Sequence, residues 1–180
     1  MQTNALYYGD CLEVMDEFPD SCIDLIYLDP PFNSSADYNC FFPSSVNYNS
    51  KHGEGAHLAQ ILAFEDTWHW DEQAFERVSD IANALAHPAH KTIKALRDVI
   101  GETGALGYLS YMAERLAKMR RILKPEGSIY LHCDYTMSHY LKVLMDDIFG
   151  ADKYRNDITW KRTTSRSDGK RYGRISDCIL

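Results

Sequence analysis

Apolar residues are grouped along this chain in patterns that predict both strands and helices. Residues 23–28 form a nearly continuous apolar run that ends at an acid and two prolines, which is typical of a strand buried on both faces of a sheet. Residues 128–133 predict a second buried strand, residues 156–161 a third, and residues 175–180 the start of another. Residues 5–8 predict a short strand ahead of all of these.

Between these runs, apolar residues recur at the spacing of amphipathic helices. Helices are expected at residues 11–18, 71–87, 91–100, 106–123 and 136–149. Residues 124–127 predict a turn. A strand, a long excursion that contains helices and a second strand make a crossover, so we expect residues 23–28 and 128–133 to pair in parallel. These elements together predict an α/β fold.

The excursion between these two strands is an insertion at residues 33–107, a loop followed by helices. Its first part, residues 33–55, is rich in Asn, Ser, Tyr and Gly without a sustained period, and loops of this length are usually functional or disordered. The aromatic residues of this loop are Tyr38, Phe41, Phe42 and Tyr48. They could stack on nucleic acid or pack the loop against the domain, and both interpretations stay open. Trp68 is interpreted as a core anchor, with a base contact as the alternative.

The strand at residues 23–28 runs directly into Asp29, Pro30, Pro31 and Phe32. Two prolines cannot continue a sheet ladder or an α-helix, so the strand must stop at Asp29. The ligands of open α/β sheets bind at the carboxyl ends of the strands. A carboxylate, a stiff turn and an aromatic ring at that edge therefore form a candidate site. An ordinary Asp-Pro turn is the alternative interpretation.

Here the chain resembles the amino-methylating DNA methyltransferases, whose catalytic tetrapeptide is Asp/Asn/Ser-Pro-Pro-Tyr/Phe/Trp. Residues 29–32 match that tetrapeptide, and further blocks of the permuted group of this family, one before it and the others after it, occur in the expected order. They lie at residues 8–12, 64–70, 121–132 and 155–161. The resemblance implies a Rossmann-like methyltransferase sheet with helices on both faces. It also implies methyl transfer to an exocyclic amine of DNA, with N6 of adenine favoured over N4 of cytosine.

The chemistry of an exocyclic amine explains the residues of the tetrapeptide. The nitrogen lone pair is delocalised into the base, so two acceptors that hold both N–H bonds can aim it at a methyl donor. Asp29 and the carbonyl of Pro30 would supply these acceptors, and the carboxylate would stabilise the developing positive charge. Phe32 would stack on the base, which must first leave the duplex.

The resemblance implies S-adenosylmethionine as the cofactor. By resemblance, Asp10 would lie near its adenosine part beside Asp29, whereas a turn residue or helix cap is the alternative interpretation of Asp10. The glycine-rich loop on which this family holds the cofactor is not found in the 180 residues. We therefore expect a fragment, the N-terminal catalytic part of a longer protein, incomplete at its C-terminus. We expect residues 1–180 alone to bind S-adenosylmethionine weakly or not at all.

Composition narrows the remaining function classes. The chain is 45% hydrophobic and 25% charged, which is ordinary for a soluble protein. No apolar run approaches the roughly 18 residues of a membrane span. The five cysteines show no Cys-x-x-Cys spacing, which favours reduced thiols in a cytoplasmic protein. His132 and Asp134 have the spacing of a facial iron site, but no third ligand is indicated, so we predict no metal.

The partners follow from the resemblance. Double-stranded DNA is the expected substrate, and a restriction subunit and a second copy of the chain are candidate partners. A nucleic-acid-binding module that kept the fold without activity is the competing class, and a methyltransferase acting on RNA is a further alternative.

The net charge of −7 looks unfavourable for a DNA-binding protein, but the basic residues are concentrated in residues 161–174. That segment contains one acid, Asp168, against Lys161, Arg162, Arg166, Lys170, Arg171 and Arg174. For phosphate contacts the local balance matters more than the total. We interpret residues 161–174 as a basic loop at the start of a DNA-binding region, with a solvated loop as the alternative.

Neutralising three of the residues Lys161, Arg162, Arg166, Lys170 and Arg171 should weaken DNA binding similarly across sequences. With fewer phosphate contacts, fewer counterions are released when the protein binds DNA. The dependence of affinity on salt concentration should therefore also flatten. Affinities measured by fluorescence anisotropy over a range of salt concentrations test this. An unchanged salt slope would favour the solvated loop.

Overall fold

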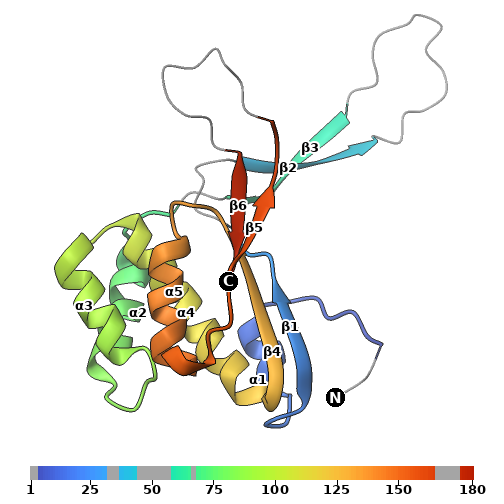
Figure 1. The fold of residues 1–180 in the computed structure, drawn as a ribbon. Coiled ribbons are helices and arrows are strands. Elements are labelled where there is room, and N and C mark those ends of the chain that lie inside the picture. The colour runs from blue at the N-terminus through green and yellow to red at the C-terminus, as the bar shows by residue number, and fades with distance from the viewer. Residues whose placement is uncertain (1–3, 32–36, 44–57, 66–67, 165–174) are drawn as a thin grey trace, which may run out of the picture.

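The computed structural model describes residues 4–31, 37–43, 58–65, 68–164 and 175–180. Its main feature is a four-stranded sheet in the order β1-β4-β6-β5, flanked by helices. The strands are β1 (Ile23–Leu28), β4 (Leu123–Cys133), β5 (Ile158–Lys161) and β6 (Ser176–Ile179). The expected α/β class is therefore confirmed (Figure 1).

The pairing of β1 with β4 is parallel, as the crossover predicted. The other two pairings, β4 with β6 and β5 with β6, are antiparallel. β6 thus lies between β4 and β5. The register aligns Leu28 at the end of β1 with Leu131 of β4, and this places the following residues of both strands at the same edge of the sheet.

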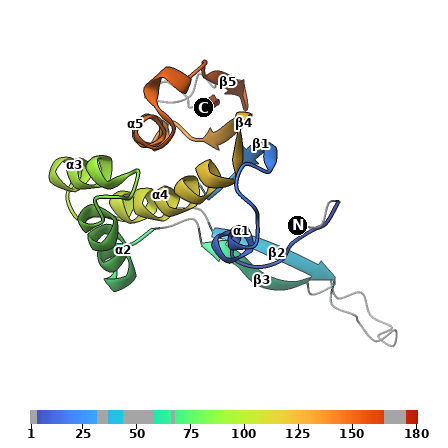
Figure 2. The same ribbon diagram turned by 90° about the horizontal axis from the view of Figure 1, so that it is seen from below.

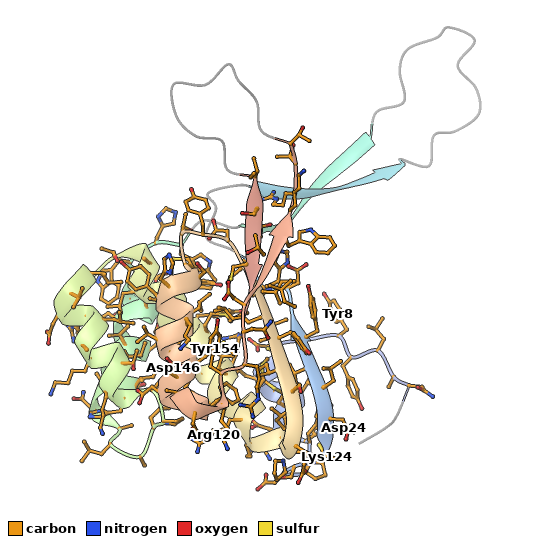
Figure 3. The ribbon with its side chains drawn as sticks, viewed as in Figure 1. Tyr8, Asp24, Arg120, Lys124, Asp146 and Tyr154 are labelled. Carbon is orange, nitrogen blue, oxygen red and sulfur yellow. The ribbon has the colours of Figure 1, made fainter. Side chains whose placement is uncertain are left out.

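The turn expected at residues 124–127 is instead part of β4. Ile23 pairs with Leu123, but Leu25 pairs with Ser128, so β4 carries extra residues opposite β1, as in a β-bulge. Lys124 Nζ donates to Asp24 Oδ1 at 2.7 Å. Figure 3 shows this exposed pair near the first residues of β1 and β4.

Residues 5–8, which were expected to form a strand, are not a strand in the structure. Leu6 is 99% exposed and Tyr8 is fully exposed. A strand is stable only when a neighbour pairs with it, and β1 pairs only with β4 in the part of the chain that the structure describes. Residues 5–8 do not pair with the edge of β1 that this leaves free, and they are not a strand.

The insertion contains two strands that the sequence analysis missed. β2 (Asp37–Pro43) and β3 (Leu58–Glu65) pair antiparallel as a separate two-stranded sheet. β2 falls inside the expected loop at residues 33–55, because its partner strand lies outside that segment and local composition does not reveal it. The side chains of the loop's aromatic residues lie outside the described part, so their role stays a prediction.

Five α-helices are described, at positions close to the expected ones. They are α1 (Cys11–Asp16), α2 (Glu72–Asn83), α3 (His90–Ile100), α4 (Gly104–Ile122) and α5 (Ser138–Phe149), and a short 3-10 helix η1 (Ala151–Lys153) follows. Asp71 begins α2 by accepting a hydrogen bond from Ala74 N–H at 2.8 Å, and Gly150, with φ of 102°, ends α5. α2 ends earlier than expected, at Asn83, because in a continuing helix the ring of Pro88 would clash with the carbonyl of Ala84.

α4 is the centre of the hydrophobic core. It contacts α1, α2, α3 and α5 and runs from α2 and α3 into the start of β4 (Figure 2). Its fully buried side chains include Leu106, Tyr108, Leu109 and Leu116. Trp68 packs on this helix with its ring centroid 4.6 Å from that of Tyr111, which confirms its interpretation as a core anchor.

α2 to α5 lie on one side of the sheet (Figure 1). The side chains of β1 and β4 that point towards them, including Ile26, Leu28 and Leu131, pack in the core. The alternate residues Leu25 and Tyr27 are more than half exposed. The prediction that β1 is buried on both faces was therefore wrong. Among the described residues, the helices cover one face of the sheet.

No helix in the described parts of the chain is long and apolar enough to cross a membrane.

Leu109→Ala should lower the free energy of unfolding by about 2–5 kcal/mol, because it leaves a cavity in the core. Leu85→Ala is the matched control, since Leu85 is 83% exposed and Leu109 is 0% exposed. The control should change stability by less than about 0.5 kcal/mol. Urea unfolding followed by circular dichroism measures both, and equal effects would contradict the assigned core.

Candidate functional site

The candidate site lies where β1 ends. β1 stops at Leu28, as the two prolines predicted, and Asp29 follows with a side chain that is 65% exposed. Pro30 and Pro31 are half-buried and hold the chain in a stiff turn. Phe32 lies outside the described residues, so its stacking role stays a prediction.

The imidazole of His132 contacts the carboxylate of Asp29. Its Nδ1 atom lies 3.0 Å from Asp29 Oδ1. The register explains this contact, because Asp29 follows Leu28 in β1, His132 follows Leu131 in β4, and the two leucines are paired. A carboxylate oxygen can only accept, so a hydrogen bond here requires the hydrogen on Nδ1.

Asp177 of β6 lies on the other side of the imidazole ring. His132 Nε2 is 3.4 Å from Asp177 Oδ2, and Arg162 donates from a terminal nitrogen to Asp177 Oδ1 at 3.2 Å. The side chain of Asp177 is 4% exposed. Asp29 directly after β1, His132 of β4, Asp177 of β6 and Arg162 directly after β5 thus form one chain of polar side chains.

His132 and Asp177 were not predicted from the sequence as site residues. His132 was considered only as an iron ligand with Asp134, and Asp134 instead accepts from the backbone N–H of Thr136 at 2.9 Å and from that of Met137 at 3.3 Å at the start of α5. The signal for His132 was its position at the carboxyl end of the second parallel strand. Asp177 had no local signal, because β6 adds to the sheet antiparallel from the end of the chain.

The predicted DNA-binding residues are described only in part. Arg162 is more than half exposed but is paired with Asp177, and Lys161 ends β5 as an exposed residue. Arg166, Lys170 and Arg171 lie outside the described residues. The structure therefore does not test the basic loop.

Cys133 is beside the site but is not a nucleophile. Burial raises the pKa of its thiol to about 12, so the thiol stays protonated at neutral pH. Its Sγ atom is 3.6 Å from the carbonyl oxygen of Cys178. Cys11, Cys22, Cys133 and Cys178 are all free thiols, which agrees with the expected reduced state for the four cysteines that the structure describes.

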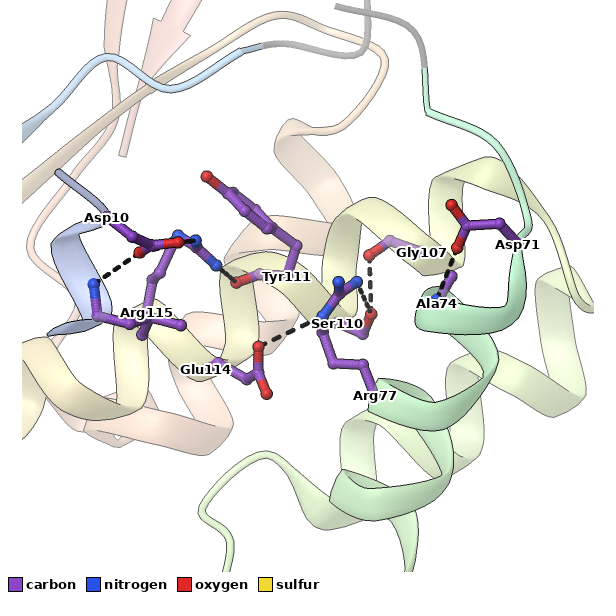
Figure 4. A network of polar contacts seen from close by, with 10 residues as sticks. Asp10, Asp71, Ala74, Arg77, Gly107, Ser110, Tyr111, Glu114 and Arg115 are labelled. Atoms are coloured by element: carbon purple, nitrogen blue, oxygen red, sulfur yellow. Dashed lines mark hydrogen bonds and ion pairs between the residues drawn. The ribbon is translucent and has the colours of Figure 1, made fainter.

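Asp10 caps α1, which was one of the two interpretations left open. Its Oδ1 atom accepts from Leu12 N–H at 2.8 Å, and Arg115 donates to Oδ1 at 3.1 Å and to Oδ2 at 2.9 Å (Figure 4). The guanidinium of Arg115 also lies over the ring of Tyr111, 3.3 Å from its centroid. Asp10 therefore ties α1 to α4.

The same contacts test whether Asp10 can also hold a cofactor hydroxyl. A carboxylate has about four acceptor positions, and the contacts with Leu12 and Arg115 use three of them. The side chain is 47% exposed. A hydroxyl group of a ribose therefore fits at Oδ2 without displacing the cap or the ion pair.

A second polar cluster lies nearer the start of α4. Arg77 Nε of α2 is 3.3 Å from Glu114 Oε2, and Ser110 donates to the carbonyl of Gly107 at 2.7 Å. Burial raises the pKa of Glu114, although Arg77 and Arg115 oppose this shift. The cluster joins α2 to α4 beside the Asp10 pair (Figure 4), so its role is packing.

Comparison with known proteins identifies relatives over most of the chain. A sequence model of the DNA methylase family matches residues 23–180. The Mod subunit of the type III restriction-modification enzyme StyLTI from Salmonella typhimurium is 26% identical over 162 residues, which are 88% of this chain and 20% of that protein. The EcoP15I Mod subunit from Escherichia coli is 23% identical over 169 residues, or 91% and 22%.

A type II methyltransferase, M.EcaI from Enterobacter cloacae, is 39% identical over 74 residues, which are 41% of this chain and 16% of that protein. The chain thus spans about a fifth of the length of the curated relatives that it matches.

Asp10→Ala should lower the free energy of unfolding by about 1–3 kcal/mol, because it removes a helix cap and leaves the buried guanidinium of Arg115 unpaired. Asp10→Asn should cost less, since the amide oxygen still caps α1. Asp20→Ala is the control, because it breaks only an exposed pair with Arg121 and should cost less than about 1 kcal/mol. Thermal unfolding compares the stability of the three variants. An Asp10→Ala variant as stable as the Asp20→Ala control would contradict the structural role of Asp10.

Proposed function

Because the chain belongs to the DNA methylase family, we propose that it carries the amine-binding part of a site-specific DNA methyltransferase. The reaction moves a methyl group to an exocyclic amine, with N6 of adenine as the favoured target. The relatives named as modification subunits and methyltransferases support this assignment.

The observation that carries the proposal is the exposed carboxylate of Asp29 at the carboxyl end of a parallel strand. The stiff Pro30-Pro31 segment directly follows it, so the carboxylate and the Pro30 carbonyl are close along the chain. An amine has two N–H bonds, and the two oxygen acceptors match them. His132 occupies one acceptor position of Asp29, and about three others remain.

In the proposed reaction, Asp29 and the Pro30 carbonyl accept the two N–H bonds of a base that has left the duplex. These hydrogen bonds draw the nitrogen towards a tetrahedral shape and free its lone pair. The carboxylate stabilises the positive charge that develops on the nitrogen as the new bond forms. The bond between the methyl group and the sulfonium of the methyl donor breaks as the bond to nitrogen forms, which would leave a neutral thioether. The carboxylate of Asp29 would accept the proton that the methylated nitrogen then loses and would release it to water.

S-adenosylmethionine would supply the methyl group in this scheme. Asp10 would accept a hydrogen bond from a hydroxyl of its ribose through Oδ2, and the negative charge of Asp29 would attract its sulfonium. Asp10 keeps its contacts with Leu12 and Arg115 throughout, so α1 and α4 hold it in place.

The complete protein is proposed to bind double-stranded DNA and to act with a restriction subunit. The support is the similarity to Mod subunits of two type III restriction-modification enzymes. Lys161 and Arg162 begin the basic segment that is proposed to contact DNA phosphates. Arg162 is anchored by Asp177, which would orient it without removing its charge from solvent.

Asp29→Ala in the complete gene product should lower the methylation rate by about 100-fold or more, because the amine loses an acceptor and the developing charge loses its partner. DNA affinity should change less than about twofold, since Asp29 contacts no phosphate in this proposal. Asp24→Ala is the matched control, because Asp24 lies at the opposite end of β1. Nucleoside mass spectrometry of the DNA product gives the rate and the modified base.

Full activity of the Asp29→Ala variant would contradict the role of Asp29. N4-methylcytosine without N6-methyladenine would reverse the choice of base. Methylated nucleosides in RNA but not in DNA would move the protein to a different substrate class.

A further inference from the structure

We propose that His132 is a positioning residue that orients the carboxylate of Asp29 for the amine. This inference rests on the proposed function of Asp29. It adds a residue that lies 103 positions away in the sequence and that contacts neither base nor cofactor in the scheme above.

The exposure of the two side chains is the first support. Asp29 is 65% exposed and His132 is 18% exposed. An exposed carboxylate rotates freely in water unless a fixed group holds it. The imidazole is fixed by its place in β4, within a paired sheet, and a hydrogen bond from Nδ1 to Oδ1 directs the other oxygen of Asp29 away from His132. Sites held by such rigid elements are the most accurately positioned.

The second support is the anchoring of the imidazole itself. Its Nε2 atom faces Asp177, which is buried and held in turn by Arg162. The ring thus faces a carboxylate at each nitrogen, and both contacts are attractive when both nitrogens carry a hydrogen, because a carboxylate only accepts. Rotation about the side-chain torsions would break both contacts. Burying the carboxylate of Asp177 costs free energy unless it is paired. Arg162 pairs with it, and this pair holds the carboxylate in place beside Nε2 of the ring.

A purely structural role for His132 makes a different prediction. That role would join β4 to β6 and would depend on the contact of Nε2 with Asp177. The positioning role depends on the contact of Nδ1 with Asp29. The two nitrogens lie at different distances from the backbone, so two substitutions can separate them.

Asparagine places its amide nitrogen near the position of Nδ1, whereas glutamine reaches towards the position of Nε2. His132→Asn therefore keeps a donor for Asp29 and loses the contact with Asp177. His132→Gln keeps the contact with Asp177 and loses the donor for Asp29. His139→Gln, an exposed histidine on α5, is the matched control.

The experiment measures kcat and KM for DNA methylation by the complete gene product. The expected result is a fall in kcat of about 100-fold for His132→Gln, with KM for DNA within about threefold and kcat of His132→Asn within about threefold of the unchanged protein. Thermal unfolding checks that each variant is folded. If His132→Gln does not fold, His132→Asn alone decides, because a loss of kcat as large as that of Asp29→Ala overturns the proposal.

The proposal is also overturned if His132→Gln keeps full kcat, if both variants lose kcat equally, or if only KM changes. A lack of methylation by the unchanged protein would refute the proposed function itself and is separate from all of these outcomes. Full activity of the unchanged protein and of His139→Gln, with the split between the two His132 variants, supports the proposal.

Discussion

The parallel pairing of β1 with β4 is the interaction on which the candidate site depends. It aligns Leu28 with Leu131 and so places the residues that follow, Asp29 and His132, within hydrogen-bond distance. Neither side chain would be held in this way by its own strand. Because a shift of one residue in the register would move each side chain to the opposite face, the chemistry of the site and the register of the sheet are linked.

The core maintains that register from one side of the sheet. Ile26, Leu28 and Leu131 pack against the helices, and α4 leads directly into β4. Asp10 connects α1 to α4 through Arg115, so the residue proposed to meet the cofactor also stabilises the framework behind the strands. Stability and function therefore share residues here, and their separation needs variants such as Asp10→Asn that retain one contact and remove another.

Local chemistry explains which parts of this structure the sequence predicted. The end of β1 followed from the prolines after Asp29, which lack the N–H that a ladder needs, and the helices followed from their spacing. Elements that depend on distant partners were not predictable. Residues 5–8 were predicted as a strand but do not pair with another strand in the described residues. β2 was not predicted, because it forms only by pairing with β3. The contact of His132 with Asp177 required an antiparallel strand from the end of the chain. The tetrapeptide carried the chemistry, but the residues that orient it became visible only in the fold.

The central claim is that Asp29 and the Pro30 carbonyl bind the amine that is methylated. A crystal structure of the complete gene product with its DNA site and an unreactive S-adenosylmethionine analogue tests this most directly. The account predicts a base outside the duplex, with its exocyclic nitrogen about 3 Å from a carboxylate oxygen of Asp29 and from the Pro30 carbonyl oxygen. A base whose amine lies beyond hydrogen-bond reach of both oxygens, with the analogue bound, would contradict it.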